Sequence, residues 1–321
     1  MSKPSRVRSL AILSTVSLAV VLSGCAGQRP HFDPEPPTVN SLPQDVQDPA
    51  ELPEDAGVDD SCNPLASYDP SDSTGGADIQ TIIDRGRLKV GVDQTTYLMG
   101  YRDPQTGDMA GFDIQIARQI AKDLLGDPDK IQYVAMSSEE REDSLKNDQV
   151  DLVVRTMTIN CARWKDVEFS GEYYHAGQKV LVPSDASDDV GDLAGKKVCS
   201  AEGSTSLLRI EDDLQATAVS VRDWADCLIL VQQGEVDAMS TDDVILAGMA
   251  AQDPNTKVIG DAISDEPYGV AAKKGNVGLI KFVNSTLDRI RDDGTWQDIY
   301  QDTLADTLGD AKPPKPKYGR D

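Results

Sequence analysis

The sequence is poor in histidine, in aromatic residues and in basic residues relative to acidic ones. Its 321 residues include only His31 and His175 as histidines, and the aromatic share is 5%. No cluster of His, Cys and carboxylate residues has metal-ligand spacing, so we predict neither a metal site nor a cofactor. No Ser/His/Asp or Cys/His arrangement stands out either, which argues against a nucleophilic enzyme. The formal net charge of −24 excludes the basic face that nucleic-acid binding requires.

Long apolar runs are also missing, with one short exception at the N-terminus. Three basic residues precede an apolar run over 10–22, which is typical of a secretory signal peptide. The run is shorter than the roughly 20 residues that a membrane-spanning helix needs. The sequence LSGC that ends at Cys25 resembles a bacterial lipobox. We therefore predict that residues 1–24 are a signal peptide, that Cys25 is lipidated, and that the protein is anchored on the extracellular face of the cell membrane.

Two segments lack the apolar periodicity of a folded domain. Residues 25–75 are rich in Pro, Asp, Glu and Ser, and residues 312–321 are rich in Pro and Lys. Such compositions bury too little apolar surface to offset the entropy of ordering. We predict a disordered tether over 25–75 and a flexible tail over 312–321.

Between these segments, strand-like and helix-like patterns alternate along the chain. Alternation of this kind predicts an α/β protein with mainly parallel sheets. A long amphipathic helix follows the last strand, with apolar residues at helical spacing from Val277 to Ile290. The predicted strands are 88–92, 131–136, 151–155, 178–182, 196–201, 218–222, 235–239, 257–260 and 268–272.

Apart from Cys25, the chain has four cysteines, and outside the cell these suggest two disulfides. Three pairings are possible. Cys199 ends a strand and Cys227 lies in a helix of the same α/β set, which favours a Cys199–Cys227 bond and leaves Cys62 to pair with Cys161. Free buried thiols remain the alternative.

The segment 151–170, DLVVRTMTINCARWKDVEFS, carries the clearest sign of a binding site. A short apolar strand ends in Arg155, Thr156 and Thr158, and Arg163 follows five residues after Thr158. Threonine hydroxyls and free backbone N–H groups beside a guanidinium can grip a carboxylate bidentately. The alternative is that Arg163 is an ordinary surface arginine after a strand.

The order Thr158, Arg163, Phe169-Ser170 resembles the cleft motif of the family 3 extracellular solute-binding proteins, which capture polar amino acids. Six further landmarks occur in the order of that family. The seven are LKVGV, GFDIQIARQIA, DLVV…TMTI…R…EFS, DLAGKKV…EGST, GEVDAMSTDD, EPYGV and VNSTLDRIRDDGTW.

The resemblance implies an α/β fold of the type II periplasmic-binding-protein kind, in which two α/β lobes are joined by a two-strand hinge and the ligand lies between them. Lobe 1 would comprise 76–181 and 267–311, and lobe 2 would comprise 182–266. The hinge crossings would fall near 179–184 and 263–268.

The resemblance also implies which residues hold the ligand's carboxylate. Arg163 would grip the α-carboxylate, supported by Thr158 and by the backbone at Thr156. From lobe 2, Gly203, Ser204 and Thr205 would hold the same group at a helix N-terminus, which attracts anions. The alternative for Gly203–Thr205 is an ordinary capped helix start.

Two further positions follow from the resemblance. Asp242 matches the family aspartate that accepts hydrogen bonds from the ligand's α-ammonium, and its alternative role is a helix N-cap. Tyr97 lies where the family places an aromatic side chain over the ligand.

Arg155 bears on the choice of ligand. Glutamine-binding relatives carry a lysine where this chain has Ala201, and a small residue where it has Arg155. A second guanidinium in the cleft would suit a second carboxylate, which favours glutamate or aspartate over glutamine. The alternative is that Arg155 pairs with a protein acid such as Asp93.

These features predict a non-enzymatic protein that captures a small amino acid and delivers it to the membrane permease of an ABC importer. An alternative is a sensor that signals through a membrane protein. A third is a dehydratase on the same fold, for which Glu202 is the only obvious cleft acid.

Overall fold

The computed structural model describes residues 42–52 and 62–320. The predicted signal peptide and Cys25 lie outside this range. Among the described residues, every helix is too short or too polar to cross a membrane. The same residues contain no group of His, Cys, Asp and Glu side chains that could hold a metal ion.

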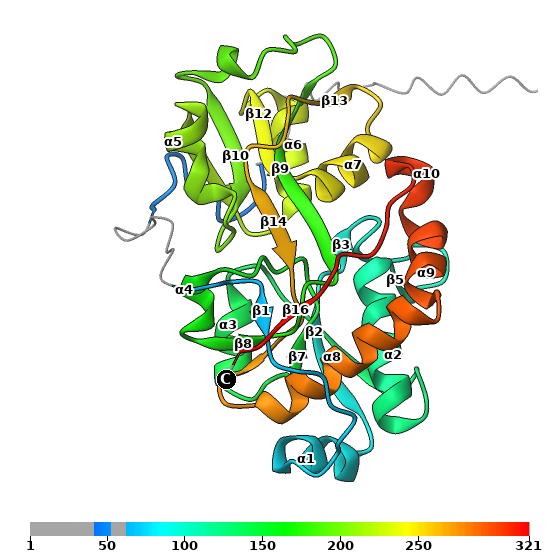
Figure 1. Ribbon diagram of the computed structural model, residues 1–321. Coiled ribbons are helices and arrows are strands. Elements are labelled where there is room, and N and C mark those ends of the chain that lie inside the picture. Colours follow the sequence, from blue (N-terminus) through cyan, green and yellow to red (C-terminus); the bar gives the residue numbers. More distant parts are fainter. Residues whose placement is uncertain (1–41, 53–61, 321) are drawn as a thin grey trace, which may run out of the picture. The chain divides into compact units, whose positions relative to one another are not determined.

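Two mixed β-sheets form the framework of the protein, one in each lobe (Figure 1). The sheet of lobe 1 has the order β6 (Ile131–Ala135), β2 (Leu88–Val92), β7 (Leu152–Val153), β15 (Ala271–Lys273), β8 (Val167–Phe169). The sheet of lobe 2 has the order β11 (Thr217–Val221), β10 (Lys197–Ala201), β12 (Ala238–Asp242), β9 (Tyr174–Pro183), β13 (Thr256–Ile259). Strand β2 is parallel to its neighbours, and so is β10. The expected α/β fold with two lobes is confirmed.

Helices cover the sheets and bury their apolar stripes. Helix α2 (Phe112–Leu125) turns Ile116, Ile120 and Leu124 into the core and ends at Gly126, which has a φ of 73°. Glycine suits that position because it adopts left-handed backbone without strain. The helices of lobe 1 are α1 (Ala77–Arg85), α2, α3 (Glu140–Lys146), α4 (Cys161–Trp164), α8 (Val277–Asp292), α9 (Thr295–Thr303) and α10 (Ala305–Leu308), and those of lobe 2 are α5 (Ile210–Leu214), α6 (Trp224–Gln233) and α7 (Asp243–Gln252).

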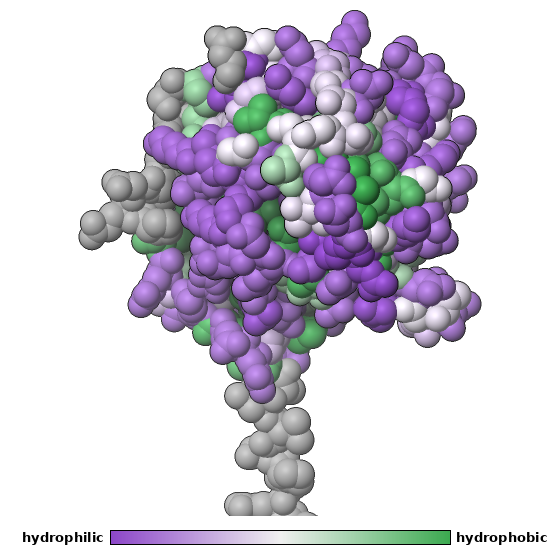
Figure 2. All heavy atoms as spheres, turned by 90° about the horizontal axis from the view of Figure 1, so that it is seen from below, coloured by the Kyte–Doolittle hydropathy of each residue, from purple (hydrophilic) through white to green (hydrophobic). Residues whose placement is uncertain are grey.

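Short elements complete the two lobes. A small antiparallel sheet in lobe 1 consists of β3 (Thr95–Thr96), β4 (Gly100–Arg102) and β5 (Met109–Ala110), and lobe 2 has 3₁₀ turns η1 (Val190–Leu193) and η2 (Leu207–Arg209). Figure 2 views one face of the molecule from below and shows it mostly hydrophilic, with apolar side chains in separate patches. Among the described residues, the large apolar side chains that are exposed are Leu42, Tyr97 and Ile229, and the others are partly or fully buried.

The crossing between the lobes is a pair of antiparallel strands. Residues 174–177 of β9 pair with β14 (Asp265–Tyr268), and residues 178–183 of the same strand pair with β12 and β13. The second crossing lies where it was predicted. The first lies about five residues before the predicted start at 179, and residues 178–181 belong to the sheet of lobe 2 instead of lobe 1. An apolar run marks a strand, but it does not show where that strand changes partner.

Part of the predicted tether is built into lobe 2. Gln47 forms an antiparallel bridge with Ser220 on the edge strand β11, and the N–H of Ala50 donates to the carbonyl of Ala218. Lys197 pairs with Asp48. The prediction of disorder is wrong for residues 42–52, because an edge strand offers unpaired backbone groups to any extended segment and needs no apolar periodicity from it.

A second part of the tether joins the C-terminal tail on lobe 1. Strand β1 (Ala66–Ser67) pairs in parallel with β16 (Lys317–Tyr318), and the hydroxyl of Tyr318 donates to Asp288 at 2.6 Å. The predictions of a disordered 62–75 and of a flexible tail are therefore wrong where the two segments pair. Each segment is the strand partner of the other, and the composition of neither segment indicates this pairing.

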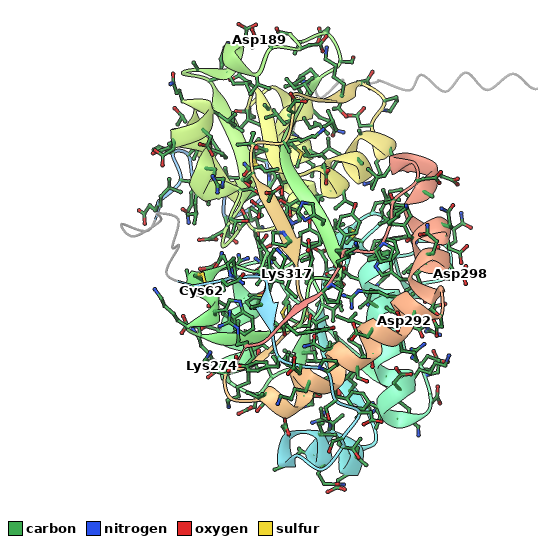
Figure 3. All side chains as sticks on the ribbon, in the orientation of Figure 1. Cys62, Asp189, Lys274, Asp292, Asp298 and Lys317 are labelled. Atoms are coloured by element: carbon green, nitrogen blue, oxygen red, sulfur yellow. A yellow bond between two sulfur atoms is a disulfide. The ribbon has the colours of Figure 1, made fainter. Side chains whose placement is uncertain are left out.

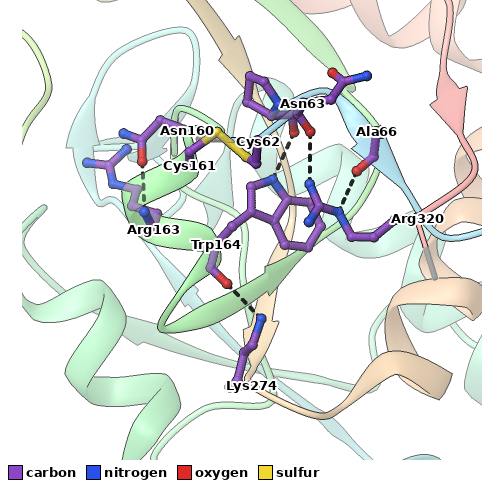
Figure 4. The surroundings of a disulfide bond; sticks show 10 residues. Cys62, Asn63, Ala66, Asn160, Cys161, Arg163, Trp164, Lys274 and Arg320 are labelled. Carbon is purple, nitrogen blue, oxygen red and sulfur yellow. Dashed lines mark hydrogen bonds between the residues drawn. A yellow bond between two sulfur atoms is a disulfide. The ribbon is translucent and has the colours of Figure 1, made fainter. Parts of the chain in front are cut away.

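Both predicted disulfides are present, Cys62–Cys161 and Cys199–Cys227. Figure 4 shows the surroundings of the first, which fastens the N-terminal segment to α4. The indole N–H of Trp164 donates to the carbonyl of Pro64 at 2.8 Å, and the guanidinium of Arg320 stacks on the indole at 3.6 Å. Helix α4, which carries Arg163, is thus held by chain segments from both ends of the protein.

We expect the double variant Cys62→Ser/Cys161→Ser to lose about 2–4 kcal/mol of unfolding free energy, because the bond closes a long loop in the unfolded chain. The two cysteines are 99 residues apart, against 28 for Cys199 and Cys227. The matched variant Cys199→Ser/Cys227→Ser should therefore lose somewhat less. Urea unfolding of the three proteins measures both losses. An unchanged transition midpoint in the first variant would contradict the expectation.

Candidate functional site

A small pocket lies between the two lobes and contains most of the predicted site residues. Its free volume is about 10 Å³, roughly the room that one water molecule needs. The lobes are therefore closed on each other here, and an amino acid would need them to move apart. Lobe 1 contributes Arg141, Thr156, Thr158 and Arg163, and lobe 2 contributes Ser204, Thr205, Ser206, Trp224 and Asp242.

Arg163 is buried at the lobe interface, with 8% of its surface exposed. Asn160 caps α4 by accepting the N–H of Arg163 at 2.8 Å, which fixes where the side chain starts. Its guanidinium donates to the carbonyl of Thr158 at 2.8 Å and, across the cleft, to the carbonyl of Gly203 at 3.0 Å. Burial lowers the pKa of Arg163 and the acid Glu142 counteracts this. The alternative of an ordinary surface arginine is wrong, and the carboxylate role stays a prediction.

Hydroxyl groups from both lobes donate hydrogen bonds to one carboxylate on the hinge. Thr158 of lobe 1 and Thr205 of lobe 2 each donate to Oε2 of Glu266 at 2.7 Å, and their own oxygens are 3.3 Å apart. Glu266 lies on β14 and also accepts the hydroxyl of Ser264 at 2.6 Å. The contacts that join the lobes here are made by the residues predicted to bind the ligand.

Thr156 lines the pocket, but its backbone N–H is already used. It has a φ of 40° and donates its N–H to Oδ2 of Asp113 at 3.0 Å. The other oxygen of Asp113 accepts the hydroxyl of Tyr173 at 2.7 Å. Burial raises the pKa of Asp113 to about 7, although both hydrogen bonds favour the charged form. A protein carboxylate therefore occupies the backbone donor that was predicted to support the ligand.

Of the described residues that line the pocket, Asp242 is the only acid. It ends β12 at the N-cap position of α7, where its side chain makes no capping hydrogen bond. Its Oδ2 accepts the hydroxyl of Tyr268 at 2.5 Å. Burial, together with the negative charge of Glu266, raises the pKa of Asp242 well above its usual range. A cation placed in the pocket would favour the ionised carboxylate and would therefore be held by it.

Arg155 does not line the pocket. It is 0% exposed, and its Nη2 lies 2.7 Å from Oδ2 of Asp93. Its other nitrogens donate to the carbonyl of Met136 at 2.8 Å and to the hydroxyl of Ser138 at 2.5 Å. The alternative of an ion pair with Asp93 is confirmed. The proposed contact between Arg155 and a ligand is contradicted, because the guanidinium is enclosed by protein groups outside the pocket.

Tyr97 also lies outside this pocket. It sits in the turn between β3 and β4, is 36% exposed, and packs edge-on against Tyr101 with ring centroids 5.0 Å apart. Both tyrosines line a separate groove with Asp302 and Asp306. The hairpin turns Tyr97 toward Tyr101, so its predicted place over the ligand is not supported. Glu202, the candidate acid of a dehydratase, is likewise not among the lining residues and accepts the amide of Gln47 at 3.3 Å.

Sequence reasoning missed two large residues of the pocket, Arg141 and Trp224. Arg141 is 2% exposed and donates to the carbonyls of Arg155, Thr156 and, across the cleft, Gly203, at 3.1–3.3 Å. Burial, with the charges of Arg163 and Arg155 nearby, lowers its pKa well below the usual range. Within the charged run of α3, no sequence signal separates Arg141 from its exposed neighbours. The sequence around Trp224 indicates only the first apolar residue of a helix, which gives no sign of a place in the pocket.

The fold and this pocket define a two-lobed solute-binding protein. Residues 88–305 match the family model described as bacterial extracellular solute-binding proteins, family 3. The chain belongs to this family, as the sequence motifs predicted.

Two relatives and one solved structure are similar to this chain over most of its length. The glutamine-binding protein GlnH of an ABC transporter of Bacillus subtilis (strain 168) is 38% identical over 226 residues, which cover 70% of this chain and 83% of the relative. The glutamate-binding protein GluB of Corynebacterium glutamicum is 31% identical over 249 residues, covering 73% and 84%. A crystal structure of a solute receptor for L-cysteine from Neisseria gonorrhoeae has a TM-score of 0.68 at 26% identity, covering 72% and 95%.

Proposed function

We propose that this protein captures glutamate, aspartate or glutamine in the pocket between its lobes and delivers it to an ABC importer. The observation that carries the proposal is the presence of Arg163 and Asp242 in the same pocket. A buried cation from lobe 1 and a buried carboxylate from lobe 2 line one small pocket. Such a pair is complementary to the α-carboxylate and α-ammonium of one amino acid. The names of the glutamine-binding and glutamate-binding relatives support the same class of ligand.

Binding would replace contacts that the lobes now make with each other. The guanidinium of Arg163 would give up the carbonyl of Gly203 for the ligand's carboxylate, a charged acceptor in place of a neutral one. Hydrogen bonds to charged groups contribute about 1.5–3 kcal/mol each. The hydroxyls of Ser204 and Thr205 also line the pocket and now donate to the carbonyl of Ala201 and to Glu266, so they would add donors to the carboxylate by giving up these acceptors. The ligand would therefore link the two lobes through groups that already face each other.

The acidic surface of the protein does not prevent capture of an anion. Exposed acids such as Asp189, Asp292 and Asp298 lie on the outside of the two lobes (Figure 3). At physiological salt, charges are screened over about 8 Å. Near the pocket, Arg141 and Arg163 face the acids Asp242, Glu266 and Glu142. Capture of an anion would therefore depend on direct contact with the two guanidinium groups, while the distant surface acids are screened.

The proposal includes attachment of the protein to the membrane through a lipid on Cys25. The support is the sequence pattern alone: a basic start, an apolar run and the residues LSGC. Mass spectrometry of the protein purified from bacterial membranes tests it. The intact protein should carry the mass of the acyl chains on an N-terminal Cys25, and the Cys25→Ser variant should appear in the soluble fraction.

A panel of amino acids tests the capture function on the chain from residue 26 onward. A ligand at 100 times its Kd stabilises a protein by about 2.7 kcal/mol. We expect glutamate, aspartate or glutamine to raise the melting temperature, and lysine and arginine to leave it unchanged. If no amino acid shifts the melting temperature and none gives a heat signal in titration calorimetry, the proposed function is wrong.

A further inference from the structure

Trp224 lines the pocket and carries a buried polar group that the capture of an α-carboxylate and an α-ammonium does not use. It is the first residue of α6, and this helix packs against β3 of the opposite lobe. Trp224 is 3% exposed and lines the pocket together with Thr156 and Arg141 of lobe 1. Its indole therefore lies where the two lobes meet.

The indole N–H of Trp224 has no hydrogen-bond partner among the described residues. The other two tryptophans of the chain show the usual arrangement. Trp164 donates to the carbonyl of Pro64 and Trp296 donates to the carbonyl of Tyr173, both at 2.8 Å. Among the described residues that line the pocket, Trp224 is the only one with a buried and unpaired side-chain donor. Leaving such a donor unpaired costs free energy, so its presence in a binding pocket calls for an explanation.

We propose that the indole N–H of Trp224 donates a hydrogen bond to an oxygen at the end of the ligand's side chain, and so selects ligands that end in a carboxylate or a carboxamide. This inference rests on the proposed capture of an amino acid. With Arg163 and Asp242 holding the α-groups, the other described residues that line the pocket include no second acid, and the buried donor among them without a partner is the N–H of Trp224. Carboxylate and amide oxygens accept such bonds, whereas the ends of lysine and arginine side chains only donate.

The Trp224→Phe variant tests the role of this donor, because it removes the N–H and keeps an aromatic ring. Titration calorimetry with glutamate, glutamine and norvaline compares ligands with and without a side-chain oxygen. We expect the Kd for the preferred one of glutamate and glutamine to rise about tenfold, the change that one hydrogen bond accounts for. The Kd for norvaline should stay the same. The unfolding free energy of the ligand-free variant should fall only by what the smaller ring loses in packing, since no protein hydrogen bond is lost.

Trp296→Phe is the matched control. Its N–H has a protein partner, and Trp296 does not line the pocket. We expect this variant to be less stable and to keep the parent's ratio of Kd values for the oxygen-bearing ligand and norvaline.

The outcomes separate the two proposals. If the parent binds glutamate or glutamine and Trp224→Phe leaves the ratio to norvaline unchanged, the role of Trp224 is wrong and the capture function stands. The role is also wrong if the variant weakens all three ligands equally, because that result indicates loss of packing. If the parent binds no amino acid, the capture function falls and the role of Trp224 falls with it.

Discussion

The Arg163→Ala variant should bind every amino-acid ligand of the protein at least about 100-fold more weakly than the parent. Two charge-assisted hydrogen bonds from one guanidinium to a carboxylate account for a loss of this size. The α-carboxylate is common to all amino acids, so the loss should not depend on the ligand's side chain. Titration calorimetry with glutamate and with glutamine measures it directly.

Two further variants show whether the geometry of the guanidinium is what matters. Arg163→Lys keeps the charge but lacks the planar fork that binds a carboxylate bidentately, so its affinity should fall between parent and alanine variant. Arg222→Ala removes an arginine that pairs with Glu140 across the cleft but is about half exposed, at 53%. Surface ion pairs contribute little, so this control should change the Kd by less than about threefold. If Arg163→Ala bound glutamate as well as Arg222→Ala does, Arg163 would not be the carboxylate clamp.

The position of Arg163 in the pocket could be predicted because the pattern that indicates it is local. The strand end, the threonines and the arginine lie within one short segment, and the turn after β7 brings Thr158 and Arg163 to the same edge of the sheet. Asp242 follows the same logic at the end of β12. The carboxyl ends of parallel strands meet at one edge, so side chains just after them gather there.

Arg155, Arg141 and Trp224 show where local reasoning fails. Arg155 follows the same strand as Thr158, yet its guanidinium points to Asp93, which is 62 residues earlier in the chain. Arg141 lies in a charged helix, and its guanidinium reaches carbonyls far along the chain, among them that of Gly203 in the opposite lobe. The indole N–H of Trp224 is buried without a partner, and the residues that surround Trp224 come from both lobes. Each of these properties depends on tertiary contacts that no short pattern encodes.

Arg155→Met should lower the unfolding free energy by about 3–5 kcal/mol, because it leaves Asp93 as a buried charge without its partner. Asp93 is 4% exposed. Its burial alone would raise its pKa, but the guanidinium of Arg155 and the hydrogen bonds from Thr95 and Thr96 hold the pKa below the usual value. Urea unfolding at neutral pH measures the loss. Because Arg155 lies outside the pocket, the ratio of Kd values for glutamate and glutamine should be the same in parent and variant.

The pH dependence of stability distinguishes a broken ion pair from a simple packing defect. In the parent, the depressed pKa of Asp93 contributes stability at neutral pH that is lost as pH falls through the folded-state pKa, below the unfolded value of about 4. In Arg155→Met, the unpaired buried carboxyl should have a raised pKa, so acidification toward that pKa should recover part of the loss. The double variant Asp93→Asn/Arg155→Met should recover it at neutral pH as well, since no charge is buried. Two results together would contradict this account: an equal loss of unfolding free energy at pH 7 and pH 5 in the single variant, and no recovery in the double variant. The attraction between Arg155 and Asp93 would then contribute nothing to holding the end of β2 against the end of β7.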